Sequence, residues 1–195
     1  RGTGACAIPA LSDCARTRNQ KTLFGKGVDV PAETIETAGH RIELSNLDKL
    51  MSERDGVRKG DVVNHYRTVA GVMLPHLRGR PLVLRRFPDG IEREGFFQKE
   101  ASDYFPDWIR TVDAPTRTRA GHVRHVVCDD EATLLYLVNQ ATIEFHIWLS
   151  TTENLDRPDQ MVLDLDPAEH TKIGDLRDAV DAVRASFDEV GLVPF

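Results

Sequence analysis

The chain has 195 residues, of which 41% are hydrophobic and 29% charged, and this composition excludes fibrous and wholly disordered proteins. It contains no run of about 18 apolar residues and does not start with a basic stretch followed by an apolar one, so the sequence predicts neither a membrane protein nor a secreted one. We therefore expect a cytoplasmic protein. The cysteines, three in number, have the spacing of neither a zinc site nor a redox pair.

The net charge of -6 is unevenly distributed along the chain. Residues 1–128 contain 21 Lys and Arg against 16 Asp and Glu, whereas residues 129–195 contain 4 against 15. A basic part beside an acidic part suits an enzyme that binds a metal ion and acts on phosphate esters. Solvated acidic helix faces explain much of the same asymmetry.

In chain order, residues 1–38 show neither helical nor strand periodicity and contain several Gly and Pro, which predicts a linker or disordered tail. Residues 39–195 are predicted to form the domain. A short strand is expected at Arg41–Leu44, one helical turn from Ser45, and an amphipathic helix at Asp61–Leu74.

Two strand pairs are predicted next. Leu82–Phe87 and Gly95–Lys99 are strand-like runs separated by the turn sequence Pro-Asp-Gly, which indicates a β-hairpin. Val112 and the run Val123–Cys128 indicate a second pair, joined by an arginine-bearing loop at residues 115–121.

The last third of the chain alternates between helix and strand patterns. The predicted elements are a helix at Asp129–Gln140, a strand at Ile143–Leu149, a strand at Met161–Asp166 and a helix from Ile173 to Val190. Within the first of these strands, alternation places Glu144, His146 and Trp148 on one face.

The tripeptide Asp164-Leu165-Asp166 is the sharpest chemical feature of the sequence. At the end of a strand, the period of two places both carboxylates on one face and the neighbouring leucines on the other. Such carboxylates repel each other unless a divalent cation such as Mg²⁺ or Mn²⁺ neutralises them, and the ion could then coordinate phosphates and activate a hydroxyl. The same tripeptide occurs in solvated turns, so this interpretation depends on the apolar strand predicted before it.

Basic residues near turns and helix starts are candidate phosphate ligands. Arg85 and Arg86 close a strand beside a tight turn, and Lys49 and Lys59 lie near the starts of helical elements, where the helix dipole also attracts an anion. Surface lysines and arginines also have a purely solvating role.

Aromatic and imidazole side chains supply further candidates. His146 could donate a hydrogen bond to a ligand, although a strand histidine is more often structural. Alternation sends one ring of the Phe96-Phe97 pair to the core and the other outward, where it could stack on a base.

Six stretches of the chain, in this order and at this spacing, carry a resemblance to a known family. They are Leu44–Leu50, Tyr66–Pro81, Phe87–Ile91, Phe96–Lys99, Ala141–His146 and Val162–Pro167. Together they resemble the polymerase domain of bacterial ATP-dependent DNA ligase D, in the archaeo-eukaryotic primase superfamily, from about His40 onward. The resemblance implies an α+β fold of the primase-polymerase type, with a mainly antiparallel sheet and flanking helices, truncated at its C-terminal side.

The resemblance also implies roles for single residues. Asp164 and Asp166 match two catalytic aspartates that bind metal, and His146 matches a catalytic histidine near the incoming nucleotide. Nucleotide-binding positions are matched by Arg85, His146 and Phe97; DNA-binding positions are matched by Lys49, Lys59, Arg86, Phe96, Arg117 and Arg119. In the family, the two lysines hold the 5′-phosphate at a DNA gap, and the last two arginines lie in a loop that helps to bring two ends together.

The implied activity is that of a repair polymerase of non-homologous end joining, which transfers a nucleotide from an NTP or dNTP to a templated DNA 3′-hydroxyl. The implied cofactor is Mn²⁺ or Mg²⁺ in a two-metal site. The implied partners are DNA ends or gaps with a 5′-phosphate, the nucleotide, Ku, and ligase and nuclease domains of the parent protein, with no membrane.

The family pattern continues with a Ser-Gly-x-Lys-Gly-x-His segment for the triphosphate and a third catalytic aspartate, neither of which is in this sequence. We therefore expect the chain alone to be inactive. Two alternatives stay open. A Mn²⁺-dependent glycosyltransferase also uses Asp-x-Asp but leaves Lys49 and Lys59 unexplained, and a DNA-end-binding module would have the fold without catalysis.

Overall fold

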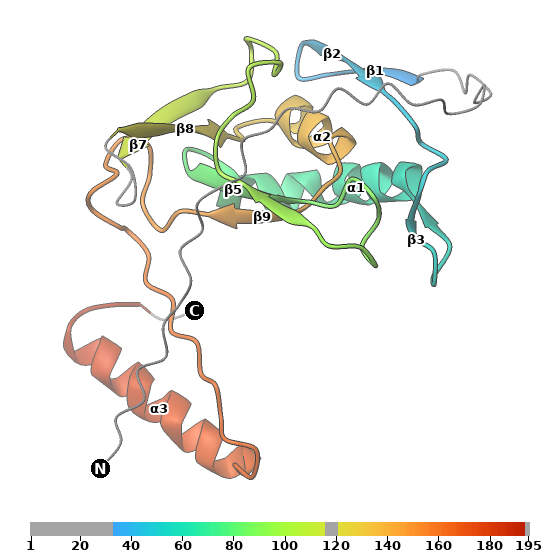
Figure 1. The fold of residues 1–195 in the computed structure, drawn as a ribbon. Coiled ribbons are helices and arrows are strands. Elements are labelled where there is room, and N and C mark those ends of the chain that lie inside the picture. The colour runs from blue at the N-terminus through green and yellow to red at the C-terminus, as the bar shows by residue number, and fades with distance from the viewer. Residues whose placement is uncertain (1–32, 116–120, 194–195) are drawn as a thin grey trace, which may run out of the picture.

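The computed structural model describes residues 33–115 and 121–193 of the chain (Figure 1). The helices in these ranges are α1 (Lys59–Leu77), α2 (Glu131–Asn139) and α3 (Ile173–Glu189). The strands are β1 (Glu33–Thr37), β2 (His40–Leu44), β3 (Leu50–Ser52), β4 (Val57–Arg58), β5 (Pro81–Arg86), β6 (Phe96–Gln98), β7 (Thr111–Pro115), β8 (His122–Val127) and β9 (Thr142–Ile147). No helix in the described part of the chain has the length and apolar character that crossing a membrane requires.

Strand β5 is the centre of a five-stranded antiparallel sheet. One of its edges pairs with β9, from Leu82 to Arg86, while the other edge pairs with β8 at its start and with β6 at its end. Strands β7 and β8 form the second hairpin. The predicted α+β fold and both predicted strand pairs are therefore confirmed.

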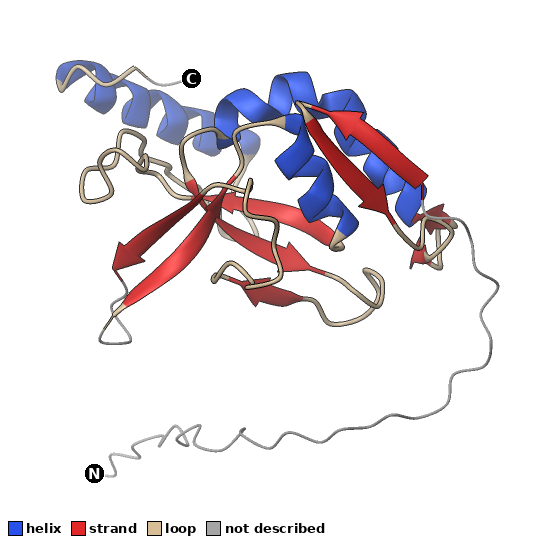
Figure 2. Cartoon of the chain, turned by 90° about the horizontal axis from the view of Figure 1, so that it is seen from above, coloured by secondary structure: helices blue, strands red, loops and turns tan. Residues whose placement is uncertain are grey.

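Helices α1 and α2 cover one face of this sheet, as Figure 2 shows. Leu82 and Leu84 of β5 point to this face and are each 1% exposed, and the Tyr66 ring of α1 lies 5.5 Å from Phe145, the cross-strand partner of Leu84. Almost every residue of α2 is buried, and its amino end is capped by Asp130, whose carboxylate accepts a hydrogen bond from the Thr133 amide. The core therefore lies between the two helices and the sheet, and no helix of the described residues covers the opposite face of the sheet.

The predicted apolar face of α1 is displaced by about one residue from the face that the helix buries. Spacing by three and four pointed to Val62, Tyr66, Val69 and Met73, which are half-buried. The fully buried apolar residues are Val63, Ala70, Leu74 and Leu77. The helix also continues past Pro75 to Leu77, although proline has no N–H to donate to the preceding turn.

Two predictions near the start of the domain are wrong. Residues 33–37 were placed in the tail, but they form β1, which pairs with β2, so the boundary at residue 38 falls inside a hairpin. The helical turn predicted from Ser45 is absent: the Ser45 amide donates to Asn139 at 3.1 Å, and Asn46 takes a left-handed conformation with φ of 55°. The left-handed conformation of Asn46 is incompatible with the first residue of a right-handed helix.

The strand predicted at Met161–Asp166 does not form either. The segment has no regular secondary structure, and all of its residues are exposed. A strand needs a partner for its backbone hydrogen bonds, and no described strand pairs with this segment. Helix α3 is confirmed, with Gly191 at a φ of 73° just past its end, but none of its residues is buried and it stands apart from the sheet (Figure 1).

Candidate functional site

Three strands place a row of side chains on the face of the sheet opposite the helices, which we call the open face. Arg85 of β5 lies directly across from Phe97 of β6 on one side and from Glu144 of β9 on the other. Directly opposed residues of antiparallel strands point to the same face, and His146 joins this face because it lies two residues beyond Glu144. Sheet register therefore fixes the four members of this open-face cluster: Arg85, Phe97, Glu144 and His146.

The four side chains contact one another in a closed ring. The Arg85 Nη1 group donates to Glu144 Oε1 at 2.9 Å, and Glu144 Oε2 lies 3.0 Å from His146 Nε2. The His146 ring meets the Phe97 ring edge-on with 5.4 Å between centroids, and the Arg85 guanidinium lies 5.3 Å from the Phe97 centroid. Each side chain is thus held by two others, while all of them remain partly exposed, from 37% for Arg85 and Glu144 to 56% for Phe97.

The cluster has the chemistry to bind an anionic ligand that carries a flat ring. The guanidinium offers several donors to phosphate oxygens, the imidazole offers one more polar contact, and the exposed Phe97 ring offers a stacking surface. Three residues predicted to bind nucleotide, Arg85, His146 and Phe97, are therefore brought together by the fold.

Arg86 and Phe96 belong to the other face of the same strands. Arg86 donates to the carbonyl of Gln140 at 2.7 Å and to the side chain of Gln98, and its guanidinium lies 5.6 Å from the Phe96 ring. The prediction that one ring of the phenylalanine pair enters the core is wrong: Phe96 is 47% exposed and Phe97 is 56% exposed, because β6 is an edge strand whose helix-side face is not covered.

The two lysines predicted to hold a 5′-phosphate are neighbours in the fold. The Lys59 amide donates to the Lys49 carbonyl at 2.8 Å, across the short β3–β4 pair at the start of α1. Lys59 is buried, and its ammonium group donates to the carbonyl of Ser45 at 2.6 Å. The Lys49 ammonium lies 3.8 Å from the Asp89 carboxylate and also donates to the Pro88 carbonyl. Burial, and then the charge of Lys49, lower the pKa of Lys59 from 10.5 to about 8.

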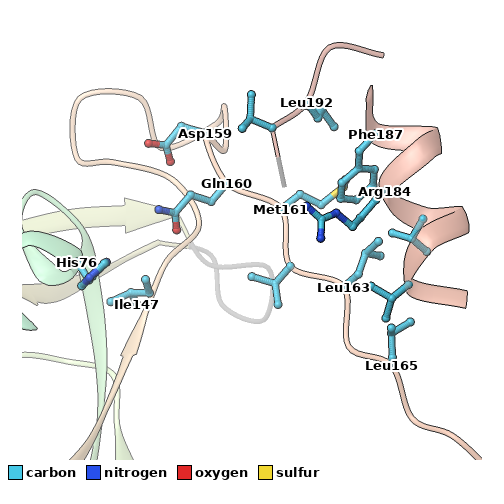
Figure 3. Close-up of a pocket in the computed structure, with 14 residues that line it drawn as sticks. His76, Ile147, Asp159, Gln160, Met161, Leu163, Leu165, Arg184, Phe187 and Leu192 are labelled. Atoms are coloured by element: carbon cyan, nitrogen blue, oxygen red, sulfur yellow. The ribbon is translucent and has the colours of Figure 1, made fainter. Parts of the chain in front are cut away.

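The pair Asp164 and Asp166 is exposed and carries no contact to the open-face cluster in the described structure. Their neighbours Leu163 and Leu165 line an open groove of about 730 Å³ that is completed by α3 residues such as Phe187, as Figure 3 shows. The carboxylates are not among the residues that line the groove, so the alternation between leucine and aspartate persists although no strand forms.

Mn²⁺ and Mg²⁺ both take oxygen ligands, and the two aspartates are donors of the right kind. Within residues 33–115 and 121–193, no group of three or more His, Cys, Asp or Glu side chains gathers around one point. The carboxylates of Asp164 and Asp166 are thus suitable for such an ion but supply only part of a ligand set. Further ligands are needed to complete it.

Two features of the site were missed or only partly seen in the sequence. Alternation put Glu144 on the face of His146, but only the β5–β9 register shows that it also bonds to Arg85. The Arg80 guanidinium forms a bidentate pair with Asp159, at 2.7 and 2.8 Å, and fixes the chain five residues before Asp164. No local pattern could have revealed a pair separated by 79 positions.

One further predicted position contributes nothing to this cluster. Trp148, expected on the same face as His146, follows the end of β9 and packs edge-on against His125 with 5.1 Å between centroids. Arg117 and Arg119 lie outside the described residues.

An α+β domain with a mainly antiparallel sheet, one face of which carries the open-face cluster, is thus the class of protein that the structure defines. A family model described as "LigD, primase-polymerase domain" matches residues 58–195, which is more than half of the chain. The chain therefore belongs to the LigD primase-polymerase domain family.

Proteins of known role agree with this assignment. The chain is 34% identical over 164 residues to the multifunctional non-homologous end joining protein LigD of Pseudomonas aeruginosa, covering 84% of this chain and 19% of that protein. It is 31% identical over 155 residues to the bifunctional non-homologous end joining protein LigD of Bacillus subtilis, covering 80% of this chain and 24% of that protein. The chain thus spans about a quarter or less of these relatives.

A solved structure supports the fold. The polymerase domain of Mycobacterium tuberculosis ligase D in complex with DNA superposes with a TM-score of 0.66 and 29% sequence identity. The match covers 78% of this chain and 55% of that domain, so the chain corresponds to about half of the solved domain.

Proposed function

We propose that the chain is the part of an end-joining repair polymerase that binds the incoming nucleotide and the 5′-phosphate of a DNA gap. The observation that carries this proposal is the open-face cluster, in which Arg85, His146 and Phe97 meet on one surface. The proposed reaction is transfer of a nucleotidyl group from an NTP or dNTP to a DNA 3′-hydroxyl opposite a template. Ku, and ligase and nuclease domains of a longer protein, are the proposed partners.

In this proposal the Arg85 guanidinium contacts the triphosphate, the Phe97 ring packs against a base or ribose, and His146 contacts the nucleotide through its free nitrogen. Asp164 and Asp166 are the residues of this chain that would hold a Mn²⁺ or Mg²⁺ ion. When bound, such an ion lowers the pKa of the attacking hydroxyl and neutralises charge on the phosphate. We expect the chain by itself not to catalyse transfer, because its described residues supply only part of the ligand set.

The second contact is with DNA. Lys49 and Lys59 lie side by side at the amino end of α1, where two ammonium groups and the helix dipole all favour a phosphate. Arg86 and Phe96, on the other face of β5 and β6, are proposed to contact the DNA strand. Arg117 and Arg119 are proposed to help hold a second DNA end.

The test is equilibrium binding of gapped DNA that carries either a 5′-phosphate or a 5′-hydroxyl at the gap. We expect the phosphate to strengthen binding by roughly tenfold, and Lys59→Gln together with Lys49→Gln to abolish that difference. Lys99→Gln is the control, because it removes a charge outside the lysine pair. Equal affinity for the two DNAs in the wild-type chain would contradict the DNA part of the proposal.

Of the alternatives that the sequence left open, membership of the LigD family decides against a glycosyltransferase. If the chain is a non-catalytic end-binding module, its DNA binding depends on the 5′-phosphate and is unchanged when a nucleotide or Mn²⁺ is added. The polymerase proposal predicts that ATP with Mn²⁺ binds to the chain, and that this binding is weakened by Arg85→Gln.

A further inference from the structure

The carboxylate of Glu144 bonds to both polar side chains of the proposed nucleotide site. One of its oxygens accepts from Arg85 at 2.9 Å and the other lies 3.0 Å from Nε2 of His146. Because each oxygen serves one partner, the two bonds do not compete. Glu144 is therefore the link between two residues that are far apart in the sequence.

We propose that Glu144 is a positioning residue that sets the tautomer of His146 and the place of the Arg85 guanidinium, and thereby decides which imidazole nitrogen faces a nucleotide. The effect on the nucleotide rests on the function proposed above. The effect on His146 itself does not.

The tautomer follows from the chemistry of the bond. An ionised carboxylate only accepts hydrogen bonds, so the hydrogen between Glu144 and His146 belongs to Nε2. In the neutral ring Nδ1 is then left as an acceptor, and the side chain is 49% exposed, so this nitrogen is free to meet a ligand. His146 is thus set to accept a hydrogen bond from a hydroxyl group, and it can donate one to a phosphate oxygen only as the cation.

Arg85 depends on Glu144 for its direction as well as for charge balance. The guanidinium lies 5.0 Å from the Phe87 centroid and 5.3 Å from the Phe97 centroid, but aromatic faces hold a cation with little directional preference. Its Nε atom is buried and has no hydrogen-bond partner among the described residues. The bond to Glu144 is therefore the directional contact that aims this long, flexible side chain.

A purely structural role explains less of the geometry. Arg85 and Glu144 each have 37% of their side chain exposed, and ion pairs this open to solvent contribute little to stability. A carboxylate that orients an imidazole acts differently, because its replacement by an amide changes which nitrogen carries the hydrogen while the fold is retained. This difference makes the two roles separable by experiment.

The test is nitrogen-15 NMR of the histidine rings in the 195-residue chain, with Glu144→Gln as the variant. We expect the wild-type His146 to carry its hydrogen on Nε2. In the variant, the amide oxygen accepts from Arg85 and the amide nitrogen donates to Nε2, so we expect the hydrogen of His146 to move to Nδ1. An unchanged tautomer in a folded Glu144→Gln variant would overturn the proposal.

Two further variants keep the result interpretable. Glu43→Gln removes an exposed strand carboxylate outside the cluster and is expected to leave the His146 signals unchanged. Glu144→Asp retains the charge on a side chain one methylene shorter, which cannot reach both partners, so a mixture of tautomers is expected. If Glu144→Gln does not fold, Glu144→Asp decides: a tautomer identical to the wild type contradicts the proposal.

Calorimetric titration with ATP and Mn²⁺ extends the test to the proposed function. We expect Glu144→Gln to weaken binding by roughly tenfold and Glu43→Gln to leave it unchanged. Equal or tighter binding by Glu144→Gln would mean that the carboxylate obstructs the anion, and would overturn the positioning role. If the wild-type chain binds no ATP but the tautomer still changes, the positioning role is supported and the proposed function is not.

Discussion

The sheet around β5 and the segment that leads into α3 have the same kind of sequence pattern but very different structures. Both Pro81–Arg86 and Met161–Asp166 are short apolar runs that end in charged residues. The first is hydrogen-bonded on both edges and buries Leu82 and Leu84, whereas the second is exposed and has no strand partner in the described structure. A strand-like sequence therefore becomes a strand only where another strand satisfies its backbone.

Hydrogen exchange provides the largest contrast between the two regions. Amides of β5 that are hydrogen-bonded within the sheet are expected to exchange on the order of a thousandfold or more slower than the amides of residues 161–166. The latter are expected to exchange fast because the segment is exposed and has no strand partner in the described structure. The measurement is exchange at single residues by NMR. Comparable protection of the two segments would mean that residues 161–166 are paired after all.

Paired leucine substitutions test the same contrast through stability. Leu135 in α2 is 0% exposed, so Leu135→Ala is expected to lower the free energy of unfolding by about 2 to 5 kcal/mol. Leu163 is 51% exposed, so Leu163→Ala is expected to cost less than about 1 kcal/mol. Urea titration followed by circular dichroism measures both, and equal losses would contradict the assignment of the core to the sheet and its two covering helices.

The proposed phosphate contact of the lysine pair predicts that DNA binding depends on pH. With a pKa of about 8, Lys59 is mostly charged at pH 7 and mostly neutral at pH 9, so its contribution to 5′-phosphate binding should fall by roughly tenfold over this range. The measurement is the affinity ratio of phosphate and hydroxyl DNA at each pH. Lys59→Gln should flatten the profile, and a steep fall that persists in this variant would place the titrating group elsewhere.

The same lowered pKa has the opposite effect on stability. Below pH 8 the Lys59 amine carries its proton in both the folded and the unfolded chain. The whole free-energy cost of burying the charged ammonium then lowers the stability of the fold. Between pH 8 and 10.5 the folded chain loses this proton before the unfolded chain does, so stability should rise relative to Lys59→Gln. Thermal unfolding at a series of pH values measures the difference in stability between the wild type and Lys59→Gln. We expect the wild type to gain stability relative to the variant as the pH rises from 8 to 10.5.

A smaller effect is expected where the two regions join, at Arg80 and Asp159. The hydrogen bonds from Arg80 hold the pKa of Asp159 below its ordinary value of 3.8. A lowered carboxyl pKa adds stability that is present above pH 3.8 and is lost as the pH falls through the folded value. Thermal unfolding should therefore show Asp159→Asn less stable than the wild type at pH 7 and nearly equal to it at the acid end. A constant difference across the pH range would show that the charge of Asp159 is not involved.

The sequence predicted the sheet well because its pattern was local and its partners were near. The β5–β6 and β7–β8 pairs are hairpins, and α2 follows from Asp130 as a cap and from continuous apolar residues. The resemblance to the family pointed to Arg85, His146 and Phe97, and the register of three strands explains why they meet.

What the sequence could not supply was pairing across long separations. The link from Arg85 through Glu144 to His146 needs the β5–β9 register, and the Arg80–Asp159 pair needs the position of a loop. The wrong prediction of a strand at Met161–Asp166 has the same origin, since alternation predicts which side chains share a side but not whether a neighbouring strand is there to pair with them. The helical turn expected at Ser45 does not form because Asn46 has a φ of 55°, a conformation that the sequence pattern did not indicate.

The central claim is that the open-face cluster, and not the groove beside α3, is where a nucleotide binds. The most direct measurement is NMR of the isotopically labelled chain during titration with ATP and the diamagnetic ion Mg²⁺. The account predicts that signals of Phe97, Glu144 and His146 shift together, while those of Val180 and Phe187 in α3 stay unchanged. Shifts confined to the groove residues, or none at the open face at saturating ATP, would contradict it.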